Sequence, residues 1–377
     1  MKVDWLIVGA GFTGATLAER IASQFGHRVL IVERRDHIAG NAFDYYDEHG
    51  ILVHKYGPHI FHTNSKKVWD YLSQFTRWRP YYHYVLGMVD GVHIPVPFNL
   101  NSLYTVFPPR YAERLERRLL SEYGHGSNVP ILRLREADSK DLRQLAEYIY
   151  QKVFLGYTVK QWGLRPDELD ASVTGRVPVR VSRDDRYFLD TYQAMPKHGY
   201  TELFRQMLQH PRIKVLLNTD YYEVAEDVNY KHLVYTGPID AFFEYKHGPL
   251  PYRSLRFLFE TVDVERIQPV GTVNYPNEFD FTRRTELKHL TGQVHPKTTV
   301  VTEYPQSYQL GINEPYYPVP HSESREAHRL YLKEAESGNR RVVFAGRLAD
   351  YRYYNMDQAV ARALSLFEQL ASSGYGA

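Results

Sequence analysis

Apolar residues at the start of the chain fall into two short blocks, separated by a glycine-rich turn and an amphipathic stretch. Val3–Val8 is the first block and Arg28–Val32 is the second, and both have the length of a buried strand. Between them, Ala15–Phe25 carries apolar residues at helical spacing. The pattern predicts a strand, a helix and a second strand, which is the arrangement of a parallel βαβ unit.

Farther along, the apolar pattern becomes helical, then strand-like, and ends in a helix. Tyr56–Thr63 is expected to be a loop, and the alternation in Tyr81–Pro97, which contains Gly91, predicts a hairpin. We expect helices at Ser102–Tyr123, with a break at Pro108 and Pro109, at Asp141–Lys152 and at Met356–Leu370. We expect strands at Ile213–Leu217, Leu233–Tyr235, Leu255–Val262, Val270–Val273 and Thr298–Thr302, and a late buried strand that runs from Val342 to Gly346.

These elements predict the α/β fold class, as a Rossmann-like domain with an inserted helical bundle and an inserted antiparallel β-sheet. The late strand is followed by Gly346, Arg347 and a helix, which is similar to a second approach of backbone to the ligand of the first turn. We therefore expect the nucleotide-binding domain to be discontinuous. Its parts are residues 1–75, 195–227 and 335–377, with a helical substrate or lid domain at 98–180 and a sheet domain at 76–97, 181–194 and 228–334.

Composition excludes several functional classes. The 377 residues include 46 basic and 44 acidic side chains, and the net charge of +2 creates no global field that favours nucleic acid. The absence of cysteine excludes disulfides, thiolate catalysis and thiolate metal sites. No apolar stretch reaches membrane-spanning length, and the first strand is too short for a signal peptide, so we expect a cytoplasmic protein without a membrane span.

Tyrosine is unusually frequent, with 32 residues in the chain. Its side chain combines a flat apolar face with a hydroxyl group, which suits a pocket that stacks a base and hydrogen-bonds a sugar phosphate. The alternative interpretation is that most of these tyrosines are ordinary half-buried residues.

The turn after the first strand has the spacing G-x-G-x-x-G, formed by Gly9, Gly11 and Gly14. Such a turn lets backbone N–H groups approach a pyrophosphate at the positive end of the helix. Glu33 ends the second strand, where a carboxylate accepts hydrogen bonds from the ribose of an adenosine. Gly40 and Asn41 follow soon after, and such an extended loop suits FAD better than NAD. The alternative is a turn that only packs the helix on the sheet.

Two histidines, His59 and His62, lie three residues apart in Y-G-P-H-I-F-H-T. A metal site would need further ligands, and none is evident in the sequence, so we predict no metal. Two histidines with local hydrogen bonds are the simpler alternative.

Seven blocks make the chain similar, over nearly its whole length, to the bacterial UDP-galactopyranose mutases. They are G-A-G-F-T-G, A-G-N-A-F-D, Y-G-P-H-I-F-H-T, F-L-G-Y-T-V-K-Q-W-G, the F-T-R at 281–283, E-P-Y-Y-P-V and G-R-L-A-D-Y-R-Y-Y-N-M-D. The tyrosine–tryptophan block and the last block are specific, because flavoproteins in general do not carry them.

The resemblance implies an isomerase that binds FAD and works with its reduced form. The family interconverts UDP-galactopyranose and UDP-galactofuranose, for use in cell-wall biosynthesis. Its chemistry forms a covalent adduct between the sugar's anomeric carbon and N5 of the reduced flavin, without net redox change. A flavin oxidase or dehydrogenase of the same FAD-binding fold, and a non-catalytic UDP-sugar-binding protein, are the alternatives. A homo-oligomer is left open.

The resemblance also implies roles for individual residues. The catalytic candidates are Arg176 and Arg283, which meet the diphosphate, and His59, which lies against the flavin. The substrate-binding set is Phe154, Tyr157, Thr158, Trp162, Arg176, Tyr187, Arg283, Tyr317, Tyr353 and Asn355. The cofactor-binding set is Gly9, Gly11, Phe12, Thr13, Gly14, Glu33, Arg34, Gly40, Asn41, His59, Ile60, His62, Gly346, Arg347, Tyr353 and Met356.

Two positions depart from the family pattern. Asn355 stands where many members carry aspartate, so a role that depends on a carboxylate there is in doubt. Ala39 stands where the family often has a second glycine, and alanine is tolerated there only if its φ is negative. Three neighbours compete with assigned residues for the same roles: Arg284, Tyr316 and Tyr354.

Overall fold

The chain divides into two compact units. A computed structural model describes residues 1–169, 177–319, 321–338 and 342–376. The first unit comprises Met1–Tyr81, Asp190–Tyr252 and Pro315–Ala377, and the second comprises Tyr82–Leu189 and Arg253–Glu314. Each unit is therefore built from segments that are distant in the sequence.

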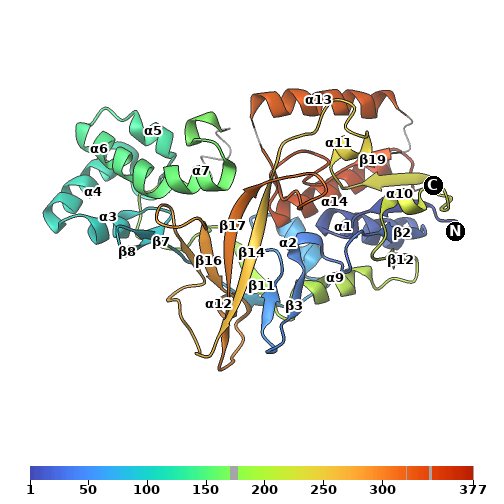
Figure 1. Ribbon diagram of the computed structural model, residues 1–377, viewed down its shortest axis with the longest axis horizontal. Coiled ribbons are helices and arrows are strands. Elements are labelled where there is room, and N and C mark those ends of the chain that lie inside the picture. The colour runs from blue at the N-terminus through green and yellow to red at the C-terminus, as the bar shows by residue number, and fades with distance from the viewer. Residues whose placement is uncertain (170–176, 320, 339–341, 377) are drawn as a thin grey trace. The chain divides into compact units, whose positions relative to one another are not determined.

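A five-stranded parallel sheet forms the centre of the first unit (Figure 1). Its order is β12-β2-β1-β13-β19, with β1 at Trp5–Val8, β2 at Val29–Val32, β12 at Ile213–Leu216, β13 at His232–Tyr235 and β19 at Val342–Phe344. The sheet joins strands from the start, middle and end of the chain. This confirms the predicted Rossmann-like α/β class and, with small shifts at their ends, the predicted strands.

Two sequence-based expectations about this sheet are wrong. Residues 228–334 were assigned to the antiparallel sheet, but β13 lies in that range and pairs in parallel with β1. The late strand β19 is half-buried instead of buried, because it is an edge strand. The division into three domains otherwise stays a prediction.

Helices cover both faces of the parallel sheet, which explains why its strands are apolar on both sides. Helix α1, Phe12–Arg20, continues into a π-helical turn at Ile21–Phe25 and packs against α14, Met356–Ser372. Together with Trp5 and Ile7 of β1 they form one apolar cluster. A second cluster, which includes Leu6 and Leu30, lies on the other face. Helix α1 begins earlier than expected, at Phe12, so that Gly14 of the glycine motif lies in its first turn.

Smaller elements complete the first unit. A three-stranded sheet has the order β5-β11-β6, and β3 and β4 form a hairpin. The expected loop at Tyr56–Thr63 is wrong at its end, because Phe61–Thr63 is strand β5 and pairs with β11. The bounds are β3 Asp44–Tyr46, β4 Leu52–His54, β5 Phe61–Thr63, β6 Trp78–Pro80, β11 Tyr192–Pro196, β18 Tyr317–Pro318, α2 Lys66–Leu72, α9 Tyr200–Leu208, α10 Tyr221–Val224, α11 Ile239–Phe242 and α13 Ser322–Ser337.

The second unit contains a helical bundle around one apolar core. Pro109 is the first residue of α4 and separates it from α3, as the sequence predicts, since proline suits the first helical position. Leu103, Leu115, Leu145 and Ile149 belong to the core. The bounds are α3 Leu100–Val106, α4 Pro109–Tyr123, α5 Ile131–Arg135, α6 Lys140–Ile149, a π-helical turn at Tyr150–Leu155, α7 Gly156–Trp162, and the short paired strands β9 Asn128–Val129 and β10 Val179–Arg180.

A mainly antiparallel sheet forms the rest of the second unit, with the order β14-β17-β16-β15-β7-β8. Its one parallel pair among the described strands is β15 with β7. The predicted hairpin is confirmed as β7 and β8. The bounds are β7 Val85–Val89, β8 Val92–Val96, β14 Tyr252–Val262, β15 Thr272–Asn274, β16 Arg283–Glu286, β17 Thr298–Ser307 and α12 Leu287–Thr291.

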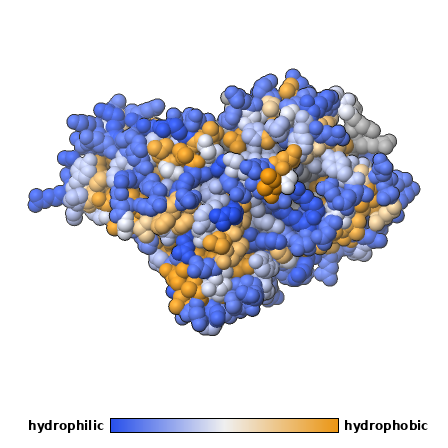
Figure 2. All heavy atoms as spheres, viewed as in Figure 1, coloured by the Kyte–Doolittle hydropathy of each residue, from blue (hydrophilic) through white to orange (hydrophobic). Residues whose placement is uncertain are grey.

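Hydrophobic residues on the face seen in Figure 2 occur in small groups among hydrophilic ones. Within the described ranges, no helix combines the length and the apolarity needed to cross a bilayer.

Candidate functional site

The glycine turn brings backbone segments closer together than any side chain would allow. Gly9 has a φ of 101°, and a Cβ there would lie 2.2 Å from Oγ1 of Thr236. A Cβ on Gly14 would lie 2.0 Å from the carbonyl oxygen of Gly9. Both contacts are impossible for real atoms, so the turn requires glycine at both positions.

Three segments distant in sequence meet at this turn. Gly346, with a φ of 109°, lies beside Thr13 and Thr236, since its Cβ would be 3.3 Å from Oγ1 of Thr13 and 3.5 Å from Cβ of Thr236. The N–H of Gly346 donates to Oδ2 of Asp350 at 3.1 Å. The expected return of the late strand and Gly346 to the first turn is therefore seen. Thr236 and Asp350 were not predicted from the sequence, because neither belongs to the glycine pattern.

Glu33 is buried at the end of β2, with 7% of its surface exposed. Its Oε2 accepts the N–H of Ala10 at 2.9 Å, and its Oε1 accepts the N–H of Arg35 at 3.0 Å. The carboxylate is thus fixed beside the glycine turn, which is the place where such an acid meets a ribose. Arg34, in the expected cofactor set, is exposed.

The segment after Glu33 returns to the glycine turn. The N–H of Ala39 donates to the carbonyl oxygen of Ala10 at 3.0 Å, and a Cβ on Gly40 would lie 3.0 Å from Cα of Gly11. Asn41 accepts from Nη1 of Arg35 at 2.9 Å. The expectation of a negative φ at Ala39 is wrong, because its φ is 74°. Alanine is held there in a left-handed conformation that favours glycine.

The two loop histidines have separate partners. The N–H of His59 donates to Nδ1 of His54 at 3.1 Å, and Nδ1 of His59 lies 2.9 Å from the carbonyl oxygen of Gly57. Burial lowers the pKa of His54 to about 4, so His54 is a neutral acceptor that fixes this loop. Nδ1 of His62 lies 3.0 Å from Oδ2 of Asp190, and this hydrogen bond lowers the pKa of Asp190. Among the described residues, no cluster of three or more metal-ligating side chains occurs.

Two tyrosines of the expected set lie together with Arg347 in the first unit. The rings of Tyr317 and Tyr353 are 5.1 Å apart, and Cζ of Arg347 lies 5.6 Å from the first ring and 5.7 Å from the second. Their neighbours differ, since Tyr316 is 5% exposed and Tyr354 provides only its carbonyl oxygen to Arg347. The geometry therefore favours Tyr317 and Tyr353 over these neighbours.

Asn355 has a structural role that an aspartate would share. It is the N-cap of α14, and its N–H donates to Oε1 of Gln358 at 2.9 Å. Asparagine and aspartate are similarly favoured at N-caps, so the helix start that holds Met356 tolerates the exchange.

In the second unit, the tyrosine–tryptophan block forms α7 and the turn before it. Trp162, the last residue of α7, is 8% exposed, and Tyr157 and Thr158 are half-buried. Phe154 belongs to the apolar core of the bundle, so packing explains at least part of its presence. Gly156 is required by close approach, because a Cβ there would lie 2.4 Å from the carbonyl oxygen of Pro276.

Arg283 and Arg284 have different surroundings. Nε and Nη2 of Arg283 donate to the two oxygens of Glu303, at 2.6 and 2.9 Å, and only 1% of the Glu303 side chain is exposed. Arg284 pairs with Glu260, whose side chain is 60% exposed, at 3.3 Å. A bidentate pair fixes the plane of the guanidinium, so Arg283 is the oriented member. Glu303 was not predicted, because its partner strand could not be inferred from sequence.

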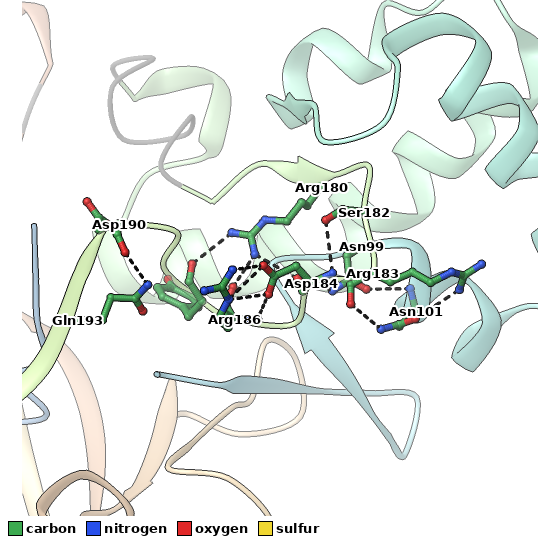
Figure 3. A network of polar contacts seen from close by, with 10 residues as sticks. Asn99, Asn101, Arg180, Ser182, Arg183, Asp184, Arg186, Asp190 and Gln193 are labelled. Carbon is green, nitrogen blue, oxygen red and sulfur yellow. Dashed lines mark hydrogen bonds and ion pairs between the residues drawn. The ribbon is translucent and has the colours of Figure 1, made fainter. Parts of the chain in front are cut away.

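Arg180 lies against the loop that contains Asp184 and Arg186 (Figure 3), and this loop leads to Tyr187. It is 4% exposed, and its guanidinium donates to the carbonyl oxygens of Asp184, Arg186 and Tyr187 at 3.2, 2.5 and 3.3 Å. The N–H of Tyr187 donates to the carbonyl oxygen of His83 at 2.7 Å. The backbone of Tyr187 is therefore held from both sides. Arg176, the other expected diphosphate ligand, lies outside the described residues.

Comparison with known proteins gives the first unit a class and the chain a family. Residues 7–75 match the NAD(P)-binding Rossmann-like domain, so the fold and the glycine turn define a dinucleotide-binding protein. Residues 152–353 match the UDP-galactopyranose mutase family model. The chain belongs to the UDP-galactopyranose mutase family and is an isomerase, which confirms the resemblance read from the sequence.

Relatives support this assignment over the whole chain. A probable UDP-galactopyranose mutase of Klebsiella pneumoniae is 38% identical over 98% of this chain and 94% of its own length. The UDP-galactopyranose mutase of Mycoplasma pneumoniae is 34% identical over 98% and 96%. A dTDP-fucopyranose mutase of Escherichia coli is 34% identical over 95% and 96%.

Among solved structures, a reduced UDP-galactopyranose mutase has the same fold, with a TM-score of 0.75 and 16% identity over 99% of this chain and 96% of its own. A putrescine oxidase has a TM-score of 0.60 at 11% identity, over 99% of both chains.

We expect Ala39→Gly to stabilise the protein. The left-handed conformation costs an L-residue about 1–2 kcal/mol, and the larger freedom of glycine in the unfolded chain offsets part of that gain, so the free energy of unfolding rises by about 0.5–1 kcal/mol. Urea denaturation measures it. Ala42→Gly is the matched control, because Ala42 is the last residue of the 3-10 turn that Ala39 precedes and has no positive φ, so this variant is expected to lose stability. A loss of stability in both variants would contradict this reading of Ala39.

We expect Glu303→Gln to lower the free energy of unfolding by about 2–4 kcal/mol, because it leaves Arg283 beside a neutral amide at a buried position. Glu260→Gln, which breaks the exposed pair with Arg284, is expected to change it little. Chemical denaturation of the two variants in parallel is the measurement. Equal losses would show that the buried pair has no special role.

Proposed function

We propose that this protein interconverts UDP-galactopyranose and UDP-galactofuranose with reduced FAD as its cofactor. The observation that carries the proposal is the glycine-lined turn near the buried Glu33, where Gly9 and Gly14 leave no room for a side chain and Gly346 leaves little. These features support a dinucleotide site, in a chain whose residues 7–75 match a dinucleotide-binding domain and which belongs to the mutase family.

The residues at this turn fit FAD. The first N–H groups of α1 suit the pyrophosphate, Glu33 suits the ribose, and the Ala39–Asn41 return supplies the extended loop that a long cofactor needs. The N-terminal half of α14, Gly346 and Arg347 are further candidates to hold it. When bound and reduced, the flavin would supply N5 as the nucleophile toward the sugar's anomeric carbon, so the reaction needs no net redox change.

The protein's own residues have the task of binding and orientation. On the family resemblance, Tyr157 of α7 stacks on the base and Trp162 of α7 lies beside the nucleotide sugar. Stacking contributes about 1–3 kcal/mol per base. Arg283, whose guanidinium plane is fixed by Glu303 through Nε and Nη2, is proposed to bind the diphosphate and to stabilise negative charge on departing UDP. On the family resemblance, Arg176 is proposed as a further ligand of the diphosphate, and Tyr317 and Tyr353 are proposed as phosphate- or sugar-contacting tyrosines.

A second substrate is a specific alternative. The 34% identical relative from Escherichia coli is named a dTDP-fucopyranose mutase. The dTDP-fucopyranose of that name differs from UDP-galactopyranose in both its base and its sugar. The oxidase alternative has only the shared fold in its favour, because the putrescine oxidase is 11% identical.

The deciding assay incubates the purified protein with UDP-galactofuranose, with and without dithionite, and separates the products by chromatography. We expect a yellow protein that forms UDP-galactopyranose only after reduction and consumes no oxygen in step with substrate. The same assay with a dTDP-fucofuranose substrate tests the alternative. A colourless protein that cannot be reconstituted with flavin, or equal turnover with oxidised flavin, contradicts the proposal.

We expect Arg176→Ala to abolish nearly all turnover and to leave flavin binding intact, because a diphosphate ligand contributes to the transition state and not to the FAD site. The measurements are kcat/KM under reducing conditions and the flavin absorbance per protein. Arg165→Ala, at an exposed arginine whose side chain is paired with Asp167, is the control. Normal activity of the Arg176 variant would remove Arg176 from the proposed site.

A further inference from the structure

Lys160 lies on α7 between Tyr157 and Trp162, yet its side chain is committed to the backbone of another segment. Its Nζ donates to the carbonyl oxygens of Tyr275, Phe279 and Phe281 at 2.5, 2.9 and 3.1 Å. An ammonium group has three N–H donors, and here three carbonyl oxygens accept them. All of these residues belong to the second unit.

The segment that Lys160 holds, residues 275–281, leads directly into β16 and Arg283. The N–H of Tyr275 donates to the carbonyl oxygen of Thr282 at 2.8 Å, which closes the loop. The rings of Tyr275, Phe279 and Phe281 pack on one another, with centroids 4.8–5.4 Å apart. The loop is therefore a compact aromatic turn, and its position determines where Arg283, at the start of β16, lies.

Other contacts join the same two segments. Gly156, at the start of α7, allows the carbonyl oxygen of Pro276 to approach, and Nδ2 of Asn277 donates to the carbonyl oxygen of Lys152 at 2.9 Å. The other end of α7 is held by a third segment, because Arg253 of β14 donates from Nε to the carbonyl oxygen of Gln161 and from Nη2 to that of Lys160, both at 3.0 Å. Between α7 and residues 275–281, Lys160 supplies the charged contact.

We propose that Lys160 is a positioning residue that fixes Tyr157, Trp162 and Arg283 relative to one another, so that a uridine diphosphate is bound by all three together. The inference rests on the proposed function, which places UDP against these residues. Sequence reasoning passed over Lys160, because a lysine inside a helix is normally read as a solvated charge.

The chemistry of the site agrees with a tether. Burial lowers the pKa of Lys160 to about 8, opposed by the charges of Glu278 and Asp280, so the ammonium form predominates at pH 7. Hydrogen bonds from a charged donor are stronger than neutral ones. Because burial of the charge is itself costly, an apolar substitute need not lower stability, and UDP affinity is the informative readout.

The test compares Lys160→Met with the wild-type full chain, using UDP itself as the probe in titration calorimetry. We expect UDP to bind the variant about tenfold more weakly. Misplaced stacking and diphosphate contacts should cost about as much binding free energy as one stacked base contributes, and about 1.4 kcal/mol corresponds to a tenfold change in Kd. Hydrogen–deuterium exchange is expected to speed up in residues 275–281, and flavin content is expected to stay unchanged. Lys160→Arg, which keeps a cation, is expected to show smaller changes in both UDP affinity and exchange rate than Lys160→Met.

Lys152→Met is the matched control. Lys152 precedes α7 by one turn, and its Nζ pairs with Asp90 at the surface at 2.6 Å, so the variant removes the same charge without the carbonyl contacts. It is expected to bind UDP as the wild type does. Lys160→Gln, which keeps two N–H donors, replaces the Met variant if that protein does not fold, with the same readouts.

Unchanged UDP affinity in the Lys160 variant overturns the inference alone. Weaker UDP binding without faster exchange in residues 275–281 also overturns it, because Lys160 would then act on UDP directly. Absence of UDP binding to the wild type contradicts the proposed function and this inference with it.

Discussion

The first unit depends on one steric constraint, which is the close approach of backbone at the βα turn. The carbonyl oxygen of Gly9 occupies the place that a Cβ on Gly14 would need, and Thr236 does the same for Gly9. This approach lets β1, β13 and the segment after β19 meet at one point, with Gly346 as the third contact. The meeting of segments from the start, middle and end of the chain at this turn requires glycine at positions 9 and 14, and the positive φ of Gly346 favours glycine there as well.

The local parts of this arrangement could be predicted from the sequence, and the long-range parts could not. Strand and helix follow from apolar spacing, so β1, α1 and β2 were found with small errors at their ends. The partner of a strand depends on the whole chain, and β13 was therefore assigned to the wrong sheet. Ala39 failed for another reason, because the backbone keeps a left-handed turn there even without glycine.

The candidate site shows the same limit at the level of side chains. Motifs single out candidates for ligand contact, such as Glu33, Trp162 and Arg283, because ligand chemistry restricts residue type. They do not identify residues that hold those residues in place. Glu303 and Arg180 act through the guanidinium of Arg283 and the backbone of Tyr187, and both contacts join segments whose proximity only the fold reveals.

Orientation has more weight than net charge at the proposed diphosphate ligand. Arg283 and Glu303 together are neutral, so this pair adds little long-range attraction for an anion. What the pair provides is a guanidinium with a fixed plane, and such a donor is useful only if the aromatic residues that bind the rest of the nucleotide are fixed in the same frame. The contacts between α7 and residues 275–281 provide that frame, with Lys160 at their centre. The positions of Tyr157, Trp162 and Arg283 therefore depend on one another, and the hydrogen bonds from the Lys160 ammonium to backbone carbonyls couple them.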